Sequence, residues 1–315
     1  MPELPEVETI RRQLEPVVAG RTIESVRVLD ERWTRPEAPR ALEAEVRGRR
    51  IEGVRRRGKY LIVDLEGKAL DERRKSRKQH RPPGKGGVHL VMHLRMTGNL
   101  LIAGEGRFGA PRLYESEPDA RFLRAVLELD DGSELWFTDA RRFGHGVVLT
   151  ADELGPYLDA RLGVEPLGGE LTGGGLMRLA EGRTAPLKSF LLDQRRVAGI
   201  GNIYADEALW RAELHPLSPA GSMREEHAEA LVEGIVEALE AGLANGGSSI
   251  DDYRDARGEM GSMQDEFLVH TREGQECARC GGVIRRIVLG GRSTYFCPGC
   301  QVRLRRRRRR RAAAR

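Results

Sequence analysis

The chain has 315 residues with a net charge of +5 and a pI of about 9.2. Its length predicts two or three domains, and its basic balance indicates a polyanionic partner such as nucleic acid. No apolar run is long enough to span a bilayer, and we find no signal peptide and no long amphipathic helix with a basic face. These features argue against a membrane-bound or secreted protein, so we expect a cytoplasmic one, monomeric by default.

The first eight residues contain two prolines, three carboxylates and no basic side chain. Once Met1 is removed, Pro2 would present a secondary amine, which is a nucleophile toward sugar C1′ carbons and can form a Schiff base. Glu3 and Glu6 lie close enough in sequence to transfer protons. The simpler interpretation of these residues alone is that Pro2 and Pro5 begin a helix, where Pro is tolerated in the first turn.

The N-terminal half is predicted to be one helix followed by short strands. Val7, Ile10, Leu14 and Val17 recur at helical spacing before Gly20, which indicates an amphipathic helix. Short segments rich in Val, Ile, Leu and aromatic residues follow, and this pattern predicts an antiparallel sandwich or barrel. The expected strands are Thr22–Leu29, Ile51–Val54, Tyr60–Leu65, Val88–Leu94, Leu100–Ile102, Arg124–Leu129, Glu134–Thr138 and Val147–Leu149.

Two turns in this half combine an apolar tip with cations, at residues 93–98 (HLRMTG) and 139–144 (DARRFG). Such turns suit a protein that wedges between bases while cations hold phosphates. Taken singly, however, Met96 and Phe143 are typical of core residues. The cation cluster at residues 55–59 (RRRGK) could also bind phosphates, but an isolated charge run is commonly a solvated strand end.

Two segments are strongly basic and have few residues that can be buried. Residues 67–87 lie between two predicted strands and indicate a flexible surface loop. Arg305–Arg311 form a block of seven arginines, which predicts a disordered tail with salt-sensitive affinity for phosphates.

From residue 151 the pattern becomes helical. Asn202 is a predicted N-cap, and the glycines just before it would leave free N–H groups suited to a phosphate, although a plain helix cap is the usual meaning. Residues 245–275 indicate a long, mobile loop, and loops of this length are often functional. The expected helices are Leu176–Ala180, Pro186–Asp193, Ile203–Arg211 and Glu225–Leu243.

All four cysteines fall in one C-terminal cluster, as the pairs Cys277-x2-Cys280 and Cys297-x2-Cys300. This spacing predicts one tetrahedral Zn²⁺ held by four thiolates, a closed structural site. Disulfides are the alternative, but they fit poorly with the lack of a secretion signal, and redox-active pairs fit less well still. Arg292 is expected at the exposed tip of a hairpin between the pairs. Its strands are expected at Ile284–Leu289 and Ser293–Phe296.

Read together, these motifs occur in an order that closely resembles bacterial formamidopyrimidine-DNA glycosylase, the 8-oxoguanine repair enzyme. The matching segments are MPELPEVET, RRGKY, HLRMTG, DARRFG, LLDQ with GIGNIYADEAL, and the four-cysteine ribbon. The resemblance implies an α+β fold in four regions. These are a catalytic β-sandwich domain at 1–150, a helix–two-turn–helix DNA-binding domain with a lesion loop at 151–265, a zinc finger at 266–301 and a disordered tail at 302–315.

The resemblance also implies a chemistry for the N-terminal residues. Pro2 would be the nucleophile that attacks C1′ of the damaged nucleotide, and Glu3 the general acid or base. Lys59 would contact the phosphate and the lesion, and Glu6 would be a supporting buried acid. The implied activity is that of a bifunctional glycosylase and abasic-site lyase acting on damaged double-stranded DNA, with one structural zinc ion and no catalytic metal.

The implied DNA contacts come from both halves of the chain. Met96, Arg141 and Phe143 would fill the gap left by an extruded base, with Arg141 facing the orphaned cytosine and Phe143 as the wedge. The 245–275 loop would close over the lesion. The remaining implied contacts to phosphate or lesion are His93, Lys188, Asn202 and Arg292.

Two alternatives remain. An endonuclease VIII-like enzyme would share the amine, the acid and the zinc ribbon but prefer oxidised pyrimidines, whereas Leu4 and the Arg141–Phe143 wedge favour the purine enzyme. A non-enzymatic zinc-ribbon DNA-binding protein would bind DNA without a covalent intermediate, but it leaves the ordered motifs unexplained.

Overall fold

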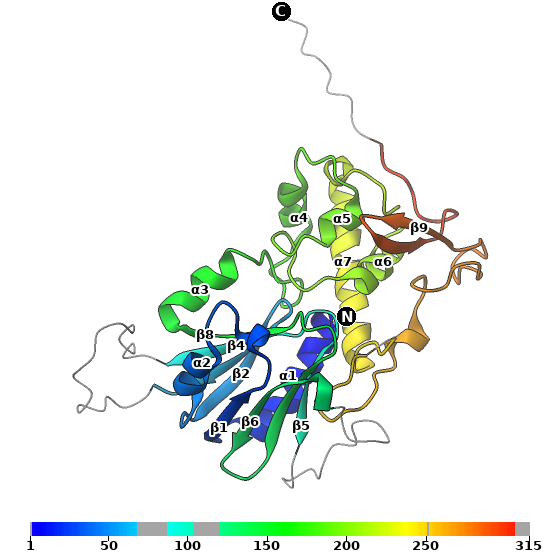
Figure 1. The fold of residues 1–315 in the computed structure, drawn as a ribbon. Helices are drawn as coiled ribbons and strands as arrows, with labels where there is room; N and C mark the ends of the chain where they lie inside the picture. Colours follow the sequence, from blue (N-terminus) through cyan, green and yellow to red (C-terminus); the bar gives the residue numbers. More distant parts are fainter. Residues whose placement is uncertain (1, 68–86, 104–119, 251, 306–315) are drawn as a thin grey trace, which may run out of the picture. The chain divides into compact units, whose positions relative to one another are not determined.

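The computed structural model of the chain is shown in Figure 1. The basic loop and the Arg-rich tail, apart from their flanking residues, lie outside the part that is described. Within that part, no helix is long and apolar enough to cross a membrane. The described residues are 2–67, 87–103, 120–250 and 252–305.

The chain divides into two compact units. The first contains residues 1–160 and 243–264, and the second contains residues 161–242 and 265–315. The residues of the expected lesion loop are therefore divided between the units after Gln264. The antiparallel sheets, the helices and the cysteine-bearing hairpin confirm the predicted α+β fold.

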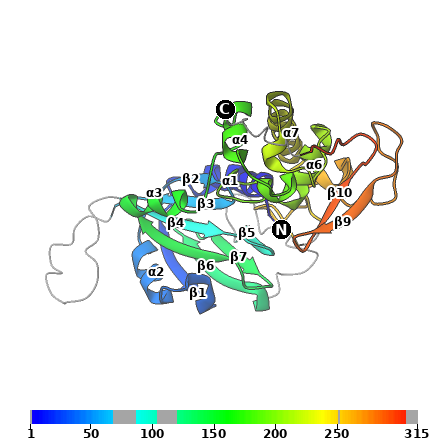
Figure 2. The same ribbon diagram turned by 90° about the horizontal axis from the view of Figure 1, so that it is seen from above.

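The first unit contains two four-stranded antiparallel sheets, which lie one above the other in Figure 2. One sheet has the order β1-β6-β7-β5 and the other β2-β3-β4-β8. All eight predicted strands are present, with ends shifted by a few residues. They are β1 Ile23–Val28, β2 Ile51–Arg57, β3 Tyr60–Leu65, β4 Val88–His93, β5 Gly98–Ala103, β6 Leu123–Leu129, β7 Glu134–Asp139 and β8 His145–Thr150.

Helix α1 (Leu4–Val18) packs into the same hydrophobic core as both sheets. Its buried stripe is Val7, Ile10, Leu14 and Val18, whereas Val17, which the sequence pattern placed in the stripe, is only partly buried. Burying each such side chain stabilises the fold by about 1.5–3 kcal/mol. The core therefore fixes the helix whose first turn carries the N-terminal carboxylates.

Two short helices of this unit were not expected from the sequence. Helix α2 (Pro39–Val46) buries only two side chains, and helix α3 (Ala151–Asp159) contains Pro156. Both therefore give weak helical signals. The 3₁₀ turns η1 (Glu31–Thr34), η2 (Ala120–Phe122), η3 (Ala220–Ser222) and η4 (Met263–Glu266) were also not expected.

The second unit contains the predicted helices and the hairpin between the cysteine pairs. Helix α5 is shorter than expected at both ends, because Pro186 is its N-cap and Leu192 its C-cap. The N-cap of α6 is Gly201, so the prediction that Asn202 caps this helix was wrong, and Asn202 is instead its first residue. The elements are α4 Gly173–Ala180, α5 Leu187–Leu191, α6 Asn202–Arg211, α7 Glu225–Ala244, β9 Arg285–Leu289 and β10 Arg292–Phe296.

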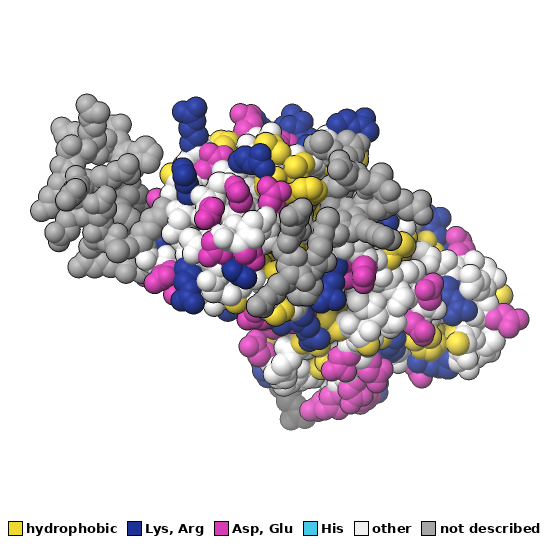
Figure 3. All heavy atoms as spheres, turned by 90° about the horizontal axis from the view of Figure 1, so that it is seen from below, with side chains coloured by type: hydrophobic (Ala, Val, Ile, Leu, Met, Phe, Trp, Pro, Cys, Tyr) yellow, Lys and Arg dark blue, Asp and Glu magenta, His cyan; other side chains and the backbone are white. Residues whose placement is uncertain are grey.

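One face of the molecule, drawn in Figure 3, carries charges of both signs. Lys and Arg side chains are spread over this face among Asp and Glu side chains, and a group of acidic side chains lies at its lower edge. This face therefore presents no single basic field that would mark it as a binding face for a polyanion.

Candidate functional site

The N-terminal residues form a buried cluster at the start of α1. Pro2, Glu3 and Glu6 are all buried, the two glutamates to 1% exposure. The Glu3 N–H donates to Glu6 Oε2 at 2.8 Å, as in a capping box. The positive end of the helix dipole stabilises carboxylates at this position. The cluster places two acids beside the candidate amine.

Glu6 also holds residues of the predicted long loop. The Ser248 N–H donates to Glu6 Oε1 at 2.8 Å, and the Tyr253 hydroxyl donates to the Glu6 carbonyl oxygen at 3.4 Å. Gly247 has a φ of +87°, and a Cβ atom there would lie 2.8 Å from Glu6 Cγ. Only glycine fits this approach without strain. Gly247, Ser248 and Tyr253 are therefore fixed to the first turn of α1.

Lys59 lies in the two-residue turn between β2 and β3 and is 7% exposed. Gly58 precedes it with a φ of +57°, the conformation that favours glycine at the first central position of such turns. Arg56 donates to the Gly58 carbonyl oxygen at 2.9 Å and to Glu8 Oε2 at 3.2 Å. Since Glu8 belongs to α1, this arginine ties the Lys59 turn to the helix that carries Pro2.

His93 lies opposite Tyr60 in the sheet, next to the Lys59 turn. Burial, and then the charges of Arg95, His145 and Lys59, lower the pKa of His93 well below its usual value. Its ring is therefore neutral near pH 7. The Arg95 N–H donates to His93 Nδ1 at 3.0 Å, which places the proton on Nε2. That nitrogen can donate a hydrogen bond to an anion.

Met96, Arg141 and Phe143 lie on two turns at the same end of the β5–β7 pair, in which Gly98 is opposite Asp139. All three side chains are exposed, Met96 to 38% and Phe143 to 53%. The Arg141 guanidinium lies 5.0 Å from the centre of the Phe143 ring. The structure thus brings together the three residues that the sequence assigned to a wedge.

Buried polar groups join these two turns. Thr97 Oγ1 donates to Asp139 Oδ1, and both atoms accept the Arg141 N–H at 3.1 Å. Asp139 Oδ2 accepts the Gly144 N–H at 2.6 Å. The sequence did not indicate this role for Thr97 or Asp139, although an aspartate that begins a turn is a recognised signal for such bonds.

The expected lysine and asparagine contacts of the second unit both form bonds to groups of the protein. We expected Lys188 near a bound nucleotide, but its side chain is fully buried and forms an ion pair with Asp206 at 2.7 Å. Asn202 Nδ2 donates to the Ser293 carbonyl oxygen at 3.1 Å. Arg292 is exposed at the start of β10, just after the Gly290-Gly291 turn, as predicted.

The four cysteines form a metal site in the second unit. Their Sγ atoms lie within 4.8 Å of one another, with Cys277 and Cys300 3.8 Å apart and Cys280 and Cys297 3.4 Å apart. Zn–S bonds of about 2.3 Å give a tetrahedral edge of about 3.8 Å, so the four thiols fit one zinc ion. With four protein ligands such an ion is structural.

The cysteine environment favours the thiolate at one ligand. Burial raises the pKa of Cys277, but hydrogen bonds from the Trp210 indole and from the backbone N–H groups of Arg279 and Cys280 bring it down to about 6. The Trp210 bond measures 3.3 Å. Zinc binds the thiolate rather than the thiol, so Cys277 is predisposed to bind the metal. Burial and the neighbouring thiols raise the pKa of Cys297 and raise that of Cys300 to about 12, so these two ligands would lose their protons on binding the cation.

Three family profiles match consecutive parts of the chain. The formamidopyrimidine-DNA glycosylase N-terminal domain matches residues 1–146, and the formamidopyrimidine-DNA glycosylase H2TH domain matches residues 162–254. The zinc finger found in FPG and IleRS matches residues 274–302. The last match, together with the clustered thiols, confirms the predicted single structural zinc ion.

Curated relatives and solved structures agree with these matches. The formamidopyrimidine-DNA glycosylases of Chloroflexus aurantiacus and Cereibacter sphaeroides are 41% and 45% identical, over 96% of this chain and 98% and 100% of theirs. Lactococcus lactis Fpg in complex with abasic-site DNA aligns with a TM-score of 0.79 and 33% identity, over 95% of this chain and 99% of that one. MutM in complex with DNA containing carbocyclic 8-oxo-G aligns with the same values.

Proposed function

Because the chain belongs to the formamidopyrimidine-DNA glycosylase family, we propose that it is a bifunctional glycosylase and abasic-site lyase of base-excision repair. Its substrates are 8-oxoguanine and formamidopyrimidines in duplex DNA. The observation that carries this proposal is the buried arrangement of Pro2, Glu3 and Glu6 at the start of α1. It sets a potential secondary amine next to carboxylates, which is the chemistry of amine catalysis.

In the proposed reaction the Pro2 nitrogen attacks C1′ of the damaged nucleotide, and the bond from C1′ to the base breaks. The base leaves with the glycosidic electron pair and takes up a proton. Glu3 gives a proton to the ring oxygen as the sugar opens, which leaves an iminium ion between Pro2 and C1′. Loss of a proton from C2′ then expels the 3′ phosphate, and a second elimination expels the 5′ phosphate. Hydrolysis of the iminium releases the enzyme.

Side chains of the first unit supply most of the DNA contacts in this proposal. A base inside a duplex must be extruded before it can react, at a cost of a few kcal/mol. Met96, Arg141 and Phe143 fill the vacancy, and the His93 Nε2–H and Lys59 bind phosphate. Asn202 and Arg292 add phosphate contacts from the second unit. The zinc ion holds the hairpin and takes no part in the chemistry, because its four ligands leave no open position.

The decisive experiment is borohydride trapping on duplex DNA that carries 8-oxoguanine opposite cytosine. The wild-type protein, after a mass measurement confirms removal of Met1, is expected to give a reduced adduct that maps to Pro2. Pro2→Gly keeps an N-terminal amine but loses the secondary one, so its trapping should be much slower.

A parallel substrate with thymine glycol tests the endonuclease VIII alternative, which predicts faster trapping there than on 8-oxoguanine. Zinc-replete protein that binds DNA but gives no adduct on either substrate would contradict amine catalysis and favour a DNA-binding module.

A further inference from the structure

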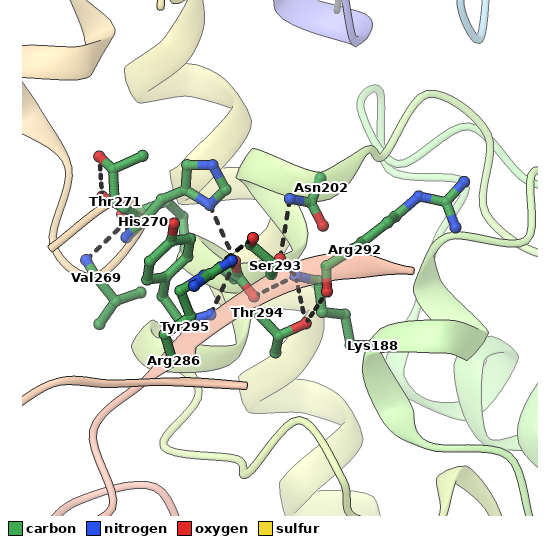
Figure 4. A network of polar contacts seen from close by, with 12 residues as sticks. Lys188, Asn202, Val269, His270, Thr271, Arg286, Arg292, Ser293, Thr294 and Tyr295 are labelled. Atoms are coloured by element: carbon green, nitrogen blue, oxygen red, sulfur yellow. Dashed lines mark hydrogen bonds and ion pairs between the residues drawn. The ribbon is translucent and has the colours of Figure 1, made fainter. Parts of the chain in front are cut away.

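Asp206, in the middle of α6, is the centre of a buried charged network in the second unit. Its partners Lys188, His270 and Tyr295 are labelled in Figure 4. Its Oδ1 forms the ion pair with Lys188 Nζ, and its Oδ2 accepts from His270 Nδ1 at 2.9 Å and from the Tyr295 N–H at 3.2 Å. The Asp206 side chain is fully buried. A buried carboxylate persists only when such partners replace its hydration.

Lys188 carries the network from Asp206 to the beginning of β10. Its Nζ donates to the Ser293 carbonyl oxygen at 2.9 Å and to Thr294 Oγ1 at 3.0 Å. Thr294 Oγ1 in turn lies 3.4 Å from the Arg292 carbonyl oxygen, to which it donates. A chain of polar contacts therefore leads from Asp206 through a lysine and a threonine to the backbone of Arg292.

Two further residues hold the same strand. His270 packs edge-on against the Tyr295 ring, with 5.0 Å between the ring centres. Glu207, the next residue in α6, accepts the backbone N–H groups of Leu268, Val269 and His270 at 3.0–3.2 Å. The two adjacent carboxylates thus fix both the segment that carries His270 and the strand on which it packs.

The Arg292 side chain is available to bind a group outside the protein. Its side chain extends away from the network in Figure 4, and it forms no ion pair with any residue in the described ranges. The two preceding residues are glycines with φ of +56° and +77°, a conformation that suits a tight hairpin turn. Arg292 then pairs with Leu289 of β9, and the network adds the Thr294 hydrogen bond to the Arg292 carbonyl oxygen.

We propose that Asp206, acting through Lys188, Thr294 and His270, is a positioning residue that orients Arg292 for phosphate binding. In this role the lysine acts on the hairpin from within the protein and does not touch the damaged nucleotide. The proposal rests on the proposed function, because it concerns a phosphate contact of that enzyme.

The first test uses full-length, zinc-loaded protein without DNA. Asp206→Asn keeps the size of the side chain but removes the charge that pairs with Lys188. We expect amide hydrogen exchange over residues 292–296 to become about tenfold faster. Asp265→Asn is the matched control, because this exposed carboxylate of the same unit forms no bond in the network. Zinc content and far-UV circular dichroism check that each variant folds.

The second test measures binding to a duplex with a tetrahydrofuran abasic-site analogue over a range of salt concentrations. Arg292→Ala should weaken binding about tenfold or more and lower the salt slope by about 1. Asp206→Asn should weaken binding and lower the salt slope by smaller amounts. The double variant should bind no more weakly than Arg292→Ala alone. Thr294→Val, which removes the hydroxyl that joins Lys188 Nζ to the Arg292 carbonyl oxygen, replaces Asp206→Asn if that variant fails to fold.

The outcomes separate the two proposals. The positioning role would be overturned if the effects of Asp206→Asn and Arg292→Ala on DNA binding multiplied in the double variant. It would also be overturned if amide hydrogen exchange over residues 292–296 in Asp206→Asn equalled that of the wild type. Wild-type protein that neither binds the analogue nor traps on 8-oxoguanine would overturn the proposed function, while the exchange experiment would still decide whether Asp206 fixes the hairpin.

Discussion

Each unit of the molecule is held by a buried carboxylate, but Glu6 and Asp206 are stabilised in different ways. Glu6 lies in the first turn of a helix, and its carboxylate oxygens accept hydrogen bonds from the backbone N–H groups of Glu3 and Ser248. Those of Asp206, in the middle of a helix, face Lys188 and His270 as well as a backbone N–H group. A helix N-terminus supports a negative charge with its own dipole, whereas a mid-helix carboxylate needs a counter-ion.

This difference predicts how each site responds to loss of a partner. A carboxylate held by backbone groups keeps them when a single side chain is replaced. One held by a buried cation is left uncompensated when the cation is removed. Mutation should therefore be far more damaging around Asp206 than around Glu6.

The largest effect is expected for Lys188→Met. Methionine fills the space of the lysine stem but leaves Asp206 without its counter-ion, so the free energy of unfolding should fall by about 3–5 kcal/mol. Urea denaturation of the zinc-loaded protein measures it. The charge-neutral pair Lys188→Met with Asp206→Asn should recover part of the loss. A loss below about 1 kcal/mol for the single variant would remove the contrast with Glu6.

A smaller effect is expected for Glu6→Gln. The new amide keeps one acceptor, but its NH₂ group faces a backbone N–H, so about 1–3 kcal/mol should be lost. Glu15→Gln on the same helix is the control, because its side chain is 46% exposed and should cost less than about 1 kcal/mol. Proteolysis within residues 246–253 should also become faster in Glu6→Gln only.

The two carboxylates also differ in how far the sequence predicts them. Glu6 stands four residues after Pro2, so a local motif identified it as a second acid. Asp206 is 64 residues from His270 and 89 from Tyr295. Only the fold brings such residues together, so the sequence did not predict that Lys188 and His270 pair with Asp206.

The difference between local signals and contacts made only in the fold also explains which other features the sequence predicted and which it did not. Strands, the main helices and the zinc site follow from periodicity and from the spacing within each cysteine pair, which are local signals. The hydrogen bond between Thr97 and Asp139 connects two turns and joins residues that are 42 positions apart in the chain. Helix α3 was missed because Pro156 interrupts its pattern.

Tyr253→Phe tests whether the loop residues depend on Glu6 alone. Removing the hydroxyl deletes its bonds to the Glu6 and Gly246 carbonyl oxygens, so about 0.5–1.5 kcal/mol should be lost. Burial, and then the charges of Glu6 and Asp255, raise the pKa of Tyr253 well above its usual value. Its stabilising effect should therefore be lost only as the pH rises above roughly 10. Ultraviolet titration should show one tyrosine that ionises only on unfolding.

The smallest effect concerns Glu8, which joins α1 to the Lys59 turn through Arg56. Burial raises the pKa of Glu8, but hydrogen bonds from Arg11 and Arg12 and the charges of Arg11 and Arg56 lower it by more, so the net pKa lies below the usual value. A folded-state pKa below the unfolded one means that the ion pairs stabilise the protein above roughly pH 4.3, and that this stabilisation is lost as the pH falls through the folded-state pKa.

Glu8→Gln should therefore cost about 0.5–1 kcal/mol at pH 7 and progressively less as the pH falls below roughly 4.3. Urea denaturation of both proteins between pH 3 and pH 7 measures the difference. The same cost at every pH would mean that Glu8 acts through packing and neutral hydrogen bonds. It would then resemble Glu6, whose carboxylate rests on backbone groups, rather than Asp206, whose carboxylate depends on a buried cation.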